Sequence, residues 1–314
     1  MGRTTTSSSF IVIVALGLCL FASAQGRAQV VSVAERHTPR PDGSSIDWSL
    51  DRQGGVGKQG ILVLGQGSGC ASVAENQNIR RARALLPDFA IVTVEKYGVE
   101  PHAAPTDPFA GCTATFYAHH TVTQRVLDYQ RVLVEAEAQP WWNGQLVLFG
   151  GSEGGAAVSI LAARVKADAV VVFSVGPGFP LRESFKRVVP PPIAVTADQR
   201  FAEIRANPQS SLVWGGSSYR WWADIMDRRL VDDLLQSDAP ILLVQGEHDH
   251  STPIEAARAA NAAFIAARHT NLTYWEFADY DHQMKDDAGH SHLDAVLGRI
   301  SAWLRTQLGK PQAG

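Results

Sequence analysis

The sequence predicts an α/β fold, in which a mostly parallel central sheet has helices on both faces and carries an inserted helical cap. Short apolar stretches typical of buried strands alternate along the chain with stretches of helical periodicity, as such a sheet requires. The alternation stops at residues 177–238, where prolines and tryptophans occur but no apolar run resembles a buried strand. We interpret that stretch as the cap, and an inert excursion of loops and helices is the alternative. The 314 residues, 45% of them hydrophobic, are enough for one domain with an insertion.

The first residues are predicted to be a secretory signal, residues 1–24, separate from the domain at 30–314. Arg3 precedes an apolar run at 10–22, and the small side chains at 22–24 suit a signal peptidase. The run is short for a membrane span, which makes a membrane anchor the weaker alternative. We therefore expect a periplasmic or secreted protein with no stable membrane insertion after the signal is cleaved.

Two cysteines remain once Cys19 leaves with the signal. Cys70 and Cys112 are an even pair in an exported chain, which favours a disulfide between them over two separate buried thiols. The formal net charge is −3 and no long basic run occurs, so there is no electrostatic reason to expect a nucleic acid partner.

The individual elements follow from their own patterns. Residues 30–53 alternate apolar and polar positions around a turn, which predicts an antiparallel hairpin at one edge of the sheet. Residues 60–70 begin as a buried strand and end as a glycine-rich loop. A long helix is predicted from about residue 115 to 139, because apolar side chains recur there on one helical face. Further strands are predicted within 89–98, 145–150, 169–174, 239–249 and 272–277, and further helices within 75–86, 153–165, 254–269 and from residue 293.

The strand at 145–150 runs into a glycine-rich turn around one serine. Residues 150–154 match the pattern G-x-S-x-G, and Ser152 stands between a strand and a helix. A sharp turn of this kind strains the serine backbone and pushes its Oγ out at the carboxyl end of the sheet. It also places the N–H groups at the start of the helix beneath the serine. We predict that Ser152 is a catalytic nucleophile, and a packing turn with an idle serine is the alternative.

A serine nucleophile needs a histidine that takes its proton and an acid that orients the histidine. The expected chain order is serine, acid and then histidine. Asp249 follows the buried strand that ends at Gly246, so it lies on the same rim of the sheet as Ser152. Glu247 is the rival acid, and a helix-capping or turn role is the alternative for Asp249.

The histidine is expected on the loop after the next strand. His282 follows Phe277 by five residues (282 − 277 = 5) and fills the third place in the order. His290 and His292 are its rivals, nearer to the last helix.

Acyl transfer also needs backbone N–H groups that face the developing oxyanion. One predicted donor is the N–H of Glu153, the residue after the nucleophile. The other is expected in the glycine-rich loop at 65–70, where we favour Ser68 N–H over Gly69 N–H. The same loop could instead cradle a dinucleotide, but its G-x-G-x-G spacing is a weak match to that motif.

These residues resemble the α/β-hydrolase superfamily, as an exported bacterial member. The resemblance covers roughly residues 55–308 and rests on the segments LVLGQGSGC, FGGSEGG, QGEHDHSTP and DYDHQM in the expected order. It implies a central sheet of about eight strands with an inserted cap, and acyl hydrolysis without a cofactor. The glycines around Ser152 are similar to those of the dienelactone-hydrolase-like and prolyl-oligopeptidase-like branches. The loop at 65–70 departs from the HGGG pattern of many lipases.

The Glu153 side chain and the paired histidines are ambiguous. We favour a solvent-facing Glu153 that complements the helix dipole, over one that binds a substrate amine or repels anions. Residues 95–98 end a strand on the active rim, where they line the pocket or pair with one another. His119 and His120 fall inside the predicted long helix, and without an HExxH motif or a cysteine cluster we predict no metal.

The sequence therefore predicts a serine hydrolase that cleaves a carboxylic ester or related acyl bond of a small molecule, without a cofactor. A compact peptidase or aminopeptidase of the same fold, acting on short peptides, is the first alternative. A non-catalytic binding protein on a hydrolase fold is the second, since a fold alone does not decide function.

Overall fold

The computed structural model describes residues 1–2, 34–53 and 55–309, and residues 34–53 and 55–309 belong to one compact unit. Apart from its first two residues, the predicted signal at 1–24 lies outside the described residues and stays a prediction. Within the described ranges, none of the helices has the length and apolar character needed to cross a membrane.

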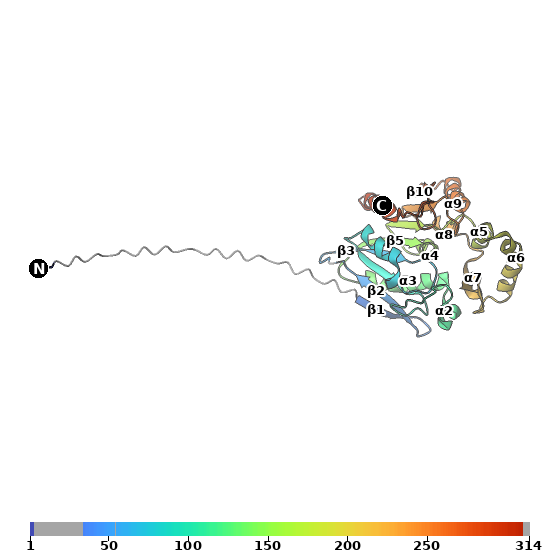
Figure 1. Ribbon diagram of the computed structural model, residues 1–314, viewed down its shortest axis with the longest axis horizontal. Coiled ribbons are helices and arrows are strands. Elements are labelled where there is room, and N and C mark those ends of the chain that lie inside the picture. The colour runs from blue at the N-terminus through green and yellow to red at the C-terminus, as the bar shows by residue number, and fades with distance from the viewer. Residues whose placement is uncertain (3–33, 54, 310–314) are drawn as a thin grey trace. The chain divides into compact units, whose positions relative to one another are not determined.

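An eight-stranded sheet forms the centre of this unit (Figure 1). Only the pairs β1–β2 and β2–β4 are antiparallel, and all other neighbours in the sheet are parallel. The antiparallel hairpin of β1 and β2 lies at one edge, as its alternating pattern predicts. In spatial order the strands are β1 (Ala34–Pro39), β2 (Ser45–Asp51), β4 (Ala90–Val94), β3 (Gln59–Gly65), β5 (Trp142–Gly151), β6 (Ala169–Phe173), β9 (Ile241–Gly246) and β10 (Leu272–Phe277).

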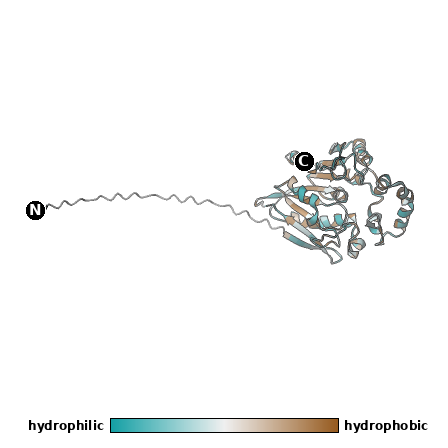
Figure 2. Cartoon of the chain, viewed as in Figure 1, coloured by the Kyte–Doolittle hydropathy of each residue, from teal (hydrophilic) through white to brown (hydrophobic). Residues whose placement is uncertain are grey.

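Helices cover both faces of the sheet. Successive residues of one strand point to opposite faces, so Ile61 and Val63 join one apolar core while Leu62 and Leu64 join the other. The first core contains α3 (Val122–Glu137), α4 (Glu153–Ala162) and α9 (Ile254–Ala266), and the second contains α1 (Gln77–Ala82) and α10 (Leu293–Leu308). Burial on both faces explains why the strands are continuous apolar runs, which Figure 2 colours brown.

The prediction of one long helix at 115–139 is wrong, because the helix is interrupted at His120 and Thr121. The first part is α2 (Ala114–His119), and α3 begins at Val122. The Thr121 hydroxyl accepts the backbone N–H of Gln124, which is the hydrogen bond of a helix N-cap and starts a new helix. The break matters for the site, because it turns the His120 side chain into the interior, where it is only 3% exposed.

The segment between β6 and β9 has no strand in the central sheet. Its helices α5, α6 and α7 stand to one side of the sheet, and its two short strands pair only with each other (Figure 1). Phe185, Phe201, Trp214 and Trp222 pack against one another within it, so tryptophans here contribute to packing. Its elements are α5 (Leu181–Val188), α6 (Pro191–Ala206), β7 (Val213–Trp214), β8 (Ser217–Ser218), α7 (Tyr219–Ile225) and α8 (Leu230–Leu234).

Candidate active site

Ser152 occupies the sharp turn between β5 and α4. Its backbone has φ 52° and ψ −125°, a strained conformation for a residue with a side chain. The strain is held by hydrogen bonds on both sides, from Ser152 N–H to the Phe173 carbonyl at 2.9 Å and from Ala156 N–H to the Ser152 carbonyl at 3.0 Å. A Cβ on Gly154 would lie 2.1 Å from the Gly65 carbonyl oxygen, so the helix and strand approach too closely for any side chain there. This is the steric reason for the glycines that the sequence pattern predicts.

Asp249 and His282 lie together at the same rim. The Nδ1 of His282 is 2.8 Å from the Oδ2 of Asp249, and Asp249 is buried. The same Oδ2 accepts hydrogen bonds from Thr252 Oγ1 at 2.6 Å and from Gln245 Nε2 at 2.7 Å. Burial alone would raise the pKa of the Asp249 carboxyl, but the hydrogen bonds from His282 and Thr252 outweigh it and hold that pKa below its ordinary value. Asp249 is therefore an ionised, fixed acceptor for the imidazole.

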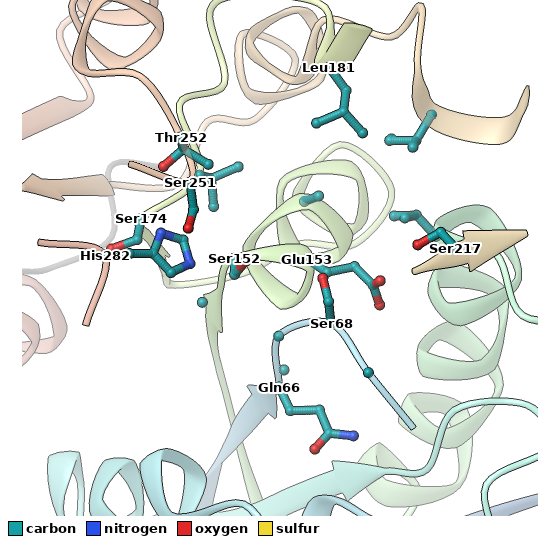
Figure 3. Close-up of a pocket in the computed structure, with 18 of the residues that line it drawn as sticks. Gln66, Ser68, Ser152, Glu153, Ser174, Leu181, Ser217, Ser251, Thr252 and His282 are labelled. Atoms are coloured by element: carbon teal, nitrogen blue, oxygen red, sulfur yellow. The ribbon is translucent and has the colours of Figure 1, made fainter. Parts of the chain in front are cut away.

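The orientation of His282 follows from this bond. An ionised carboxylate can only accept hydrogen bonds, so Nδ1 carries the proton that it shares with Asp249, and Nε2 is left to accept another. Figure 3 shows the His282 ring facing Ser152, and both residues line one cavity.

The rival residues lie elsewhere. The Glu247 carboxylate forms an exposed ion pair with Arg258 at 3.0 Å. His292 and His290 both pair with Asp286, at 2.9 Å and 3.4 Å. None of these three predicted rivals lines the cavity that contains Ser152.

The cavity over Ser152 has a volume of about 660 Å³ and two unlike walls. One wall is the glycine-rich loop after β3, together with Ser152 and His282. The other wall comes from the segment between β6 and β9. It is largely apolar through Phe179, Leu181, Phe185, Trp221, Trp222 and Ile225, and it also includes the polar residues Ser184, Ser217, Ser218 and Arg228.

The glycine-rich loop packs directly on the serine. A Cβ on Gly67 would lie 3.3 Å from the Cβ of Ser152, so a side chain at this position of the loop would crowd the side chain of Ser152. Ser68 and Gly69, the two predicted candidates for an oxyanion donor, also line the cavity. In the described part of the chain, neither donates its backbone N–H to another protein group. The loop ends at Cys70, which forms a disulfide with Cys112, as the sequence predicts.

The Glu153 side chain does not face solvent, so that expectation is wrong. Its carboxylate is only 4% exposed and lies 3.1 Å from His120 Nε2, 3.1 Å from Arg125 Nη1 and 3.4 Å from Lys96 Nζ. Burial would raise the pKa of the Glu153 carboxyl, but the charges of Lys96 and His120 hold it well below its usual range. Burial lowers the pKa of Lys96 to about 8 and also lowers that of His120.

Sequence reasoning missed this charged cluster because its members come from three segments. Arg125 did leave a signal, since it falls three residues after Val122 on the buried face of α3. Lys96 lies in the segment 95–98, which was expected to line the pocket or to pair internally. Instead Lys96 reaches Glu153 and the glycine-rich loop, while Glu95 accepts hydrogen bonds from Ser72 and Val73.

Ser174 is a second residue that the sequence did not single out. It lines the cavity at the end of β6, with φ 52° and 1% exposure. Its hydroxyl has no hydrogen-bond partner among the described residues. As for metals, residues 34–53 and 55–309 contain no group of three or more His, Cys, Asp or Glu side chains placed to hold an ion, and the absence of a metal stays a prediction.

The fold is that of the α/β hydrolases, as the sequence predicts. The structure is similar to Est1E from Butyrivibrio proteoclasticus with ferulic acid bound, at 17% identity and a TM-score of 0.61, over 88% of this chain and 100% of that one. It is also similar to a putative dienelactone hydrolase from Klebsiella pneumoniae, at 18% identity and a TM-score of 0.57, over 87% of this chain and 99% of that one. A third similar structure is the Pyrococcus horikoshii acylaminoacyl peptidase, at 11% identity and a TM-score of 0.61, over 90% of this chain and 43% of that one. No protein-family model matches the sequence, and no curated protein is significantly similar to it.

Proposed function

We propose that this protein is a serine hydrolase that cleaves a carboxylic ester of a small, partly apolar molecule through Ser152, His282 and Asp249. The observation that carries the proposal is the fixed pair of His282 Nδ1 and Asp249 Oδ2 at 2.8 Å, in the same cavity as a strained Ser152. A strained serine, an oriented imidazole and a cavity for the substrate are three of the features that acyl transfer requires.

The chemistry begins with the attack of Ser152 Oγ on the ester carbonyl. As the bond forms, His282 Nε2 takes the hydroxyl proton, and the carbonyl π electrons move onto oxygen. Asp249 keeps the imidazole in the required tautomer and stabilises the imidazolium that forms. His282 then gives the proton to the leaving alcohol, and an acyl-enzyme remains on Ser152.

The oxyanion is bound by backbone groups in this proposal. Glu153 N–H lies in the first turn of α4, where N–H groups have no carbonyl partner within the helix. Ser68 N–H is the proposed second donor, since Ser68 lines the cavity and follows Gly67, the loop position next to the Ser152 side chain. Water, activated by His282, then attacks the acyl-enzyme and releases the acid.

The surroundings of Glu153 favour an ester over a peptide as the substrate. An aminopeptidase reading needs an acid that can pair with a substrate amine, and Glu153 was the candidate. Its carboxylate is already paired with Lys96, Arg125 and His120, so its negative charge is compensated inside the protein and is not available to a substrate amine. The apolar wall of the cavity instead suits an aliphatic or aromatic group, and ferulic acid in the similar Est1E structure is aromatic. We therefore propose that residues 177–238 form a cap whose apolar side chains contact the apolar part of the substrate.

The location of the protein stays part of the proposal. The disulfide between Cys70 and Cys112 supports the predicted periplasmic or secreted location, because such bonds persist in oxidising compartments.

The direct test is labelling with a fluorophosphonate, followed by mapping of the modified peptide. We expect an adduct on Ser152, and in Ser152→Ala no adduct and a loss of about 10³-fold or more in kcat on a nitrophenyl ester. Ser217→Ala is the matched control, because it removes another hydroxyl of the cavity and should keep both labelling and activity. A folded native protein that does not label would support a non-catalytic binding protein instead.

The bond type is tested by comparing rates on nitrophenyl esters with rates on aminoacyl amides. We expect kcat/KM to be higher for the esters and to increase with the apolar size of the acyl group, since each buried CH₂ contributes about 0.8 kcal/mol. Faster cleavage of aminoacyl amides would favour the peptidase.

A further inference from the structure

Lys96 is a buried lysine beside the site that the mechanism above does not use. It follows β4 and is 1% exposed, a degree of burial that is rare for this residue type. It is not one of the residues that line the cavity, so it does not reach the substrate. Removing an ammonium from water is costly unless the charge is paired and hydrogen-bonded. The contacts of Lys96 therefore indicate what the charge is used for.

The ammonium of Lys96 contacts three oxygens. Its Nζ donates to the backbone carbonyls of Gly67 and Gly69, both at 2.6 Å, and lies 3.4 Å from Glu153 Oε1. A lysine ammonium has three N–H donors and no acceptor, so these three oxygens use its full capacity. Two of them belong to the glycine-rich loop, and the third belongs to the residue after Ser152.

The contact with Gly67 fixes the direction of the Ser68 N–H. The Gly67 carbonyl and the Ser68 N–H belong to one peptide group, which is planar and trans. In a trans peptide the C=O and the N–H point in opposite directions, so holding the oxygen against Lys96 directs the N–H away from Lys96. Gly65, Gly67 and Gly69 have no side chains with which to anchor this peptide, and the side chain of Gln66 donates to the Ala71 carbonyl farther along the chain.

The contact with Glu153 reaches the second donor. Glu153 supplies the other N–H of the proposed oxyanion site, at the start of α4. Its carboxylate is held by Arg125 and His120 as well as by Lys96. Lys96 joins this anchored residue to the carbonyls of Gly67 and Gly69, so one ammonium connects the two segments that carry the two donors.

We propose that Lys96 is a positioning residue that holds the glycine-rich loop so that Ser68 N–H and Glu153 N–H face the oxyanion together. The inference rests on the proposed serine hydrolase activity and adds to it the group that aligns the oxyanion site. Lys96 acts through the loop and does not itself touch the reacting atoms.

The test begins with Lys96→Met, which keeps most of the side-chain volume and removes the ammonium. The variant should fold, because the remaining Glu153 and Arg125 are still a charge-balanced pair at 3.1 Å. We expect kcat to decrease about 10- to 100-fold with KM within about threefold of native, somewhat less than the loss of about 10²–10³-fold for deleting an oxyanion donor.

A transition-state analogue separates positioning from a general structural role. A trifluoromethyl ketone reacts with Ser152 when Oγ adds to the ketone carbon, the proton passes to His282 and the negative charge goes to the ketone oxygen. Its affinity for Lys96→Met should fall by about the same factor as kcat/KM. The matching methyl ketone, which binds without this charge, should keep its affinity within about twofold.

Arg40→Met is the matched control. Arg40 is another buried cation with a buried partner, Asp128 at 2.9 Å, but it does not contact the glycine-rich loop. We expect this variant to have a lower melting temperature and a native kcat and ketone affinity. Equal losses of kcat and analogue affinity in Arg40→Met would show that any buried charge has this effect, and would overturn the proposal.

Two further outcomes would also overturn it. The first is a folded Lys96→Met with kcat and trifluoromethyl ketone affinity within about threefold of native. The second is Lys96→Gln with native values, because an amide one bond shorter cannot reach all three oxygens; this variant serves if Lys96→Met does not fold.

The behaviour of the native protein distinguishes a failure of the proposed role of Lys96 from a failure of the proposed hydrolase function. If native protein labels on Ser152 and hydrolyses the ester while both Lys96 variants match it, only the role of Lys96 fails. If native protein neither labels nor hydrolyses, the proposed function fails and the role of Lys96 fails with it.

Discussion

On one side of Ser152 stand two side chains, His282 and Asp249, and on the other stands a loop of backbone groups at 65–70. The first side is held by neutral donors, since Thr252 and Gln245 both hydrogen-bond to the carboxylate of Asp249. The second side is held by the charged ammonium of Lys96, which donates to two carbonyls of the loop, and by the covalent disulfide at Cys70.

The difference follows from what each side must position. A side chain brings its own polar atoms and is fixed by hydrogen bonds to them. Glycine positions can approach the nucleophile closely only because they lack side chains, so their peptide groups must be held by groups from elsewhere in the fold. On this view the imidazole side is a local construction and the loop side depends on distant segments, and the following predictions test that contrast.

The largest effect is expected on the imidazole side, from Asp249→Asn. An asparagine amide in place of the carboxylate would donate to Nδ1 and leave the proton on Nε2, where it cannot accept the serine proton. We expect kcat to fall about 10³- to 10⁴-fold, measured on a nitrophenyl ester, with little change in KM. Glu247→Gln is the matched control, since this nearby acid forms an exposed pair with Arg258 and should keep kcat within about twofold. Similar losses in both variants would contradict the assignment of Asp249.

An intermediate effect is expected on the loop side, from the double variant Cys70→Ser and Cys112→Ser. Opening a crosslink with a sequence separation of 42 should lower the free energy of unfolding by about 3–4 kcal/mol. The end of the glycine-rich loop would also lose its covalent anchor, and we expect kcat to decrease about three- to tenfold, a fraction of the loss for a deleted donor. Denaturant unfolding and ester kinetics measure the two quantities.

Reductant is the control for this disulfide experiment. It should lower kcat of the native protein and leave the double variant unchanged. A native kcat in the double variant would mean that Lys96 alone is enough to hold the loop.

The smallest effect is expected from pH, through the ionisation of Lys96. Burial lowers its pKa from 10.5 to about 8, with Glu153 opposing the shift and Arg125 adding to it. Between these values the unfolded chain holds a proton that the native protein has lost, so the contribution of Lys96 to the free energy of unfolding increases with pH. The kcat should decrease over the same pH range, because the neutral amine of Lys96 loses its ion pair with Glu153.

The measurement compares kcat of native protein and of Lys96→Met at about pH 7.5 and about pH 9.5. We expect native kcat to fall about two- to fivefold over this range, a modest loss since the neutral amine still donates two hydrogen bonds. No corresponding step should occur in the variant. The same decrease in both proteins would assign the titration to another group.

The sequence by itself determined the parts of this protein whose causes are local. The alternation of strands and helices predicted the sheet, because burial on both faces makes each strand a continuous apolar run. The turn around Ser152 was predictable from its glycines, since the close approach of strand and helix excludes any side chain at Gly154. His282 and Asp249 were predicted from their places after two consecutive strands, because parallel strands end on one rim.

Only the tertiary structure decided how charge is placed around the site. The N-cap residue Thr121 interrupts the expected helix, and the His120 side chain points into the interior. The Glu153 carboxylate is buried against Arg125 and Lys96. No local pattern encodes these contacts, because Lys96 precedes Glu153 by 57 positions (153 − 96 = 57). The two residues meet only when the sheet has formed and the ends of their strands lie at the same rim. A buried charge has a role only through its partners, and partners that distant in sequence are chosen by the fold.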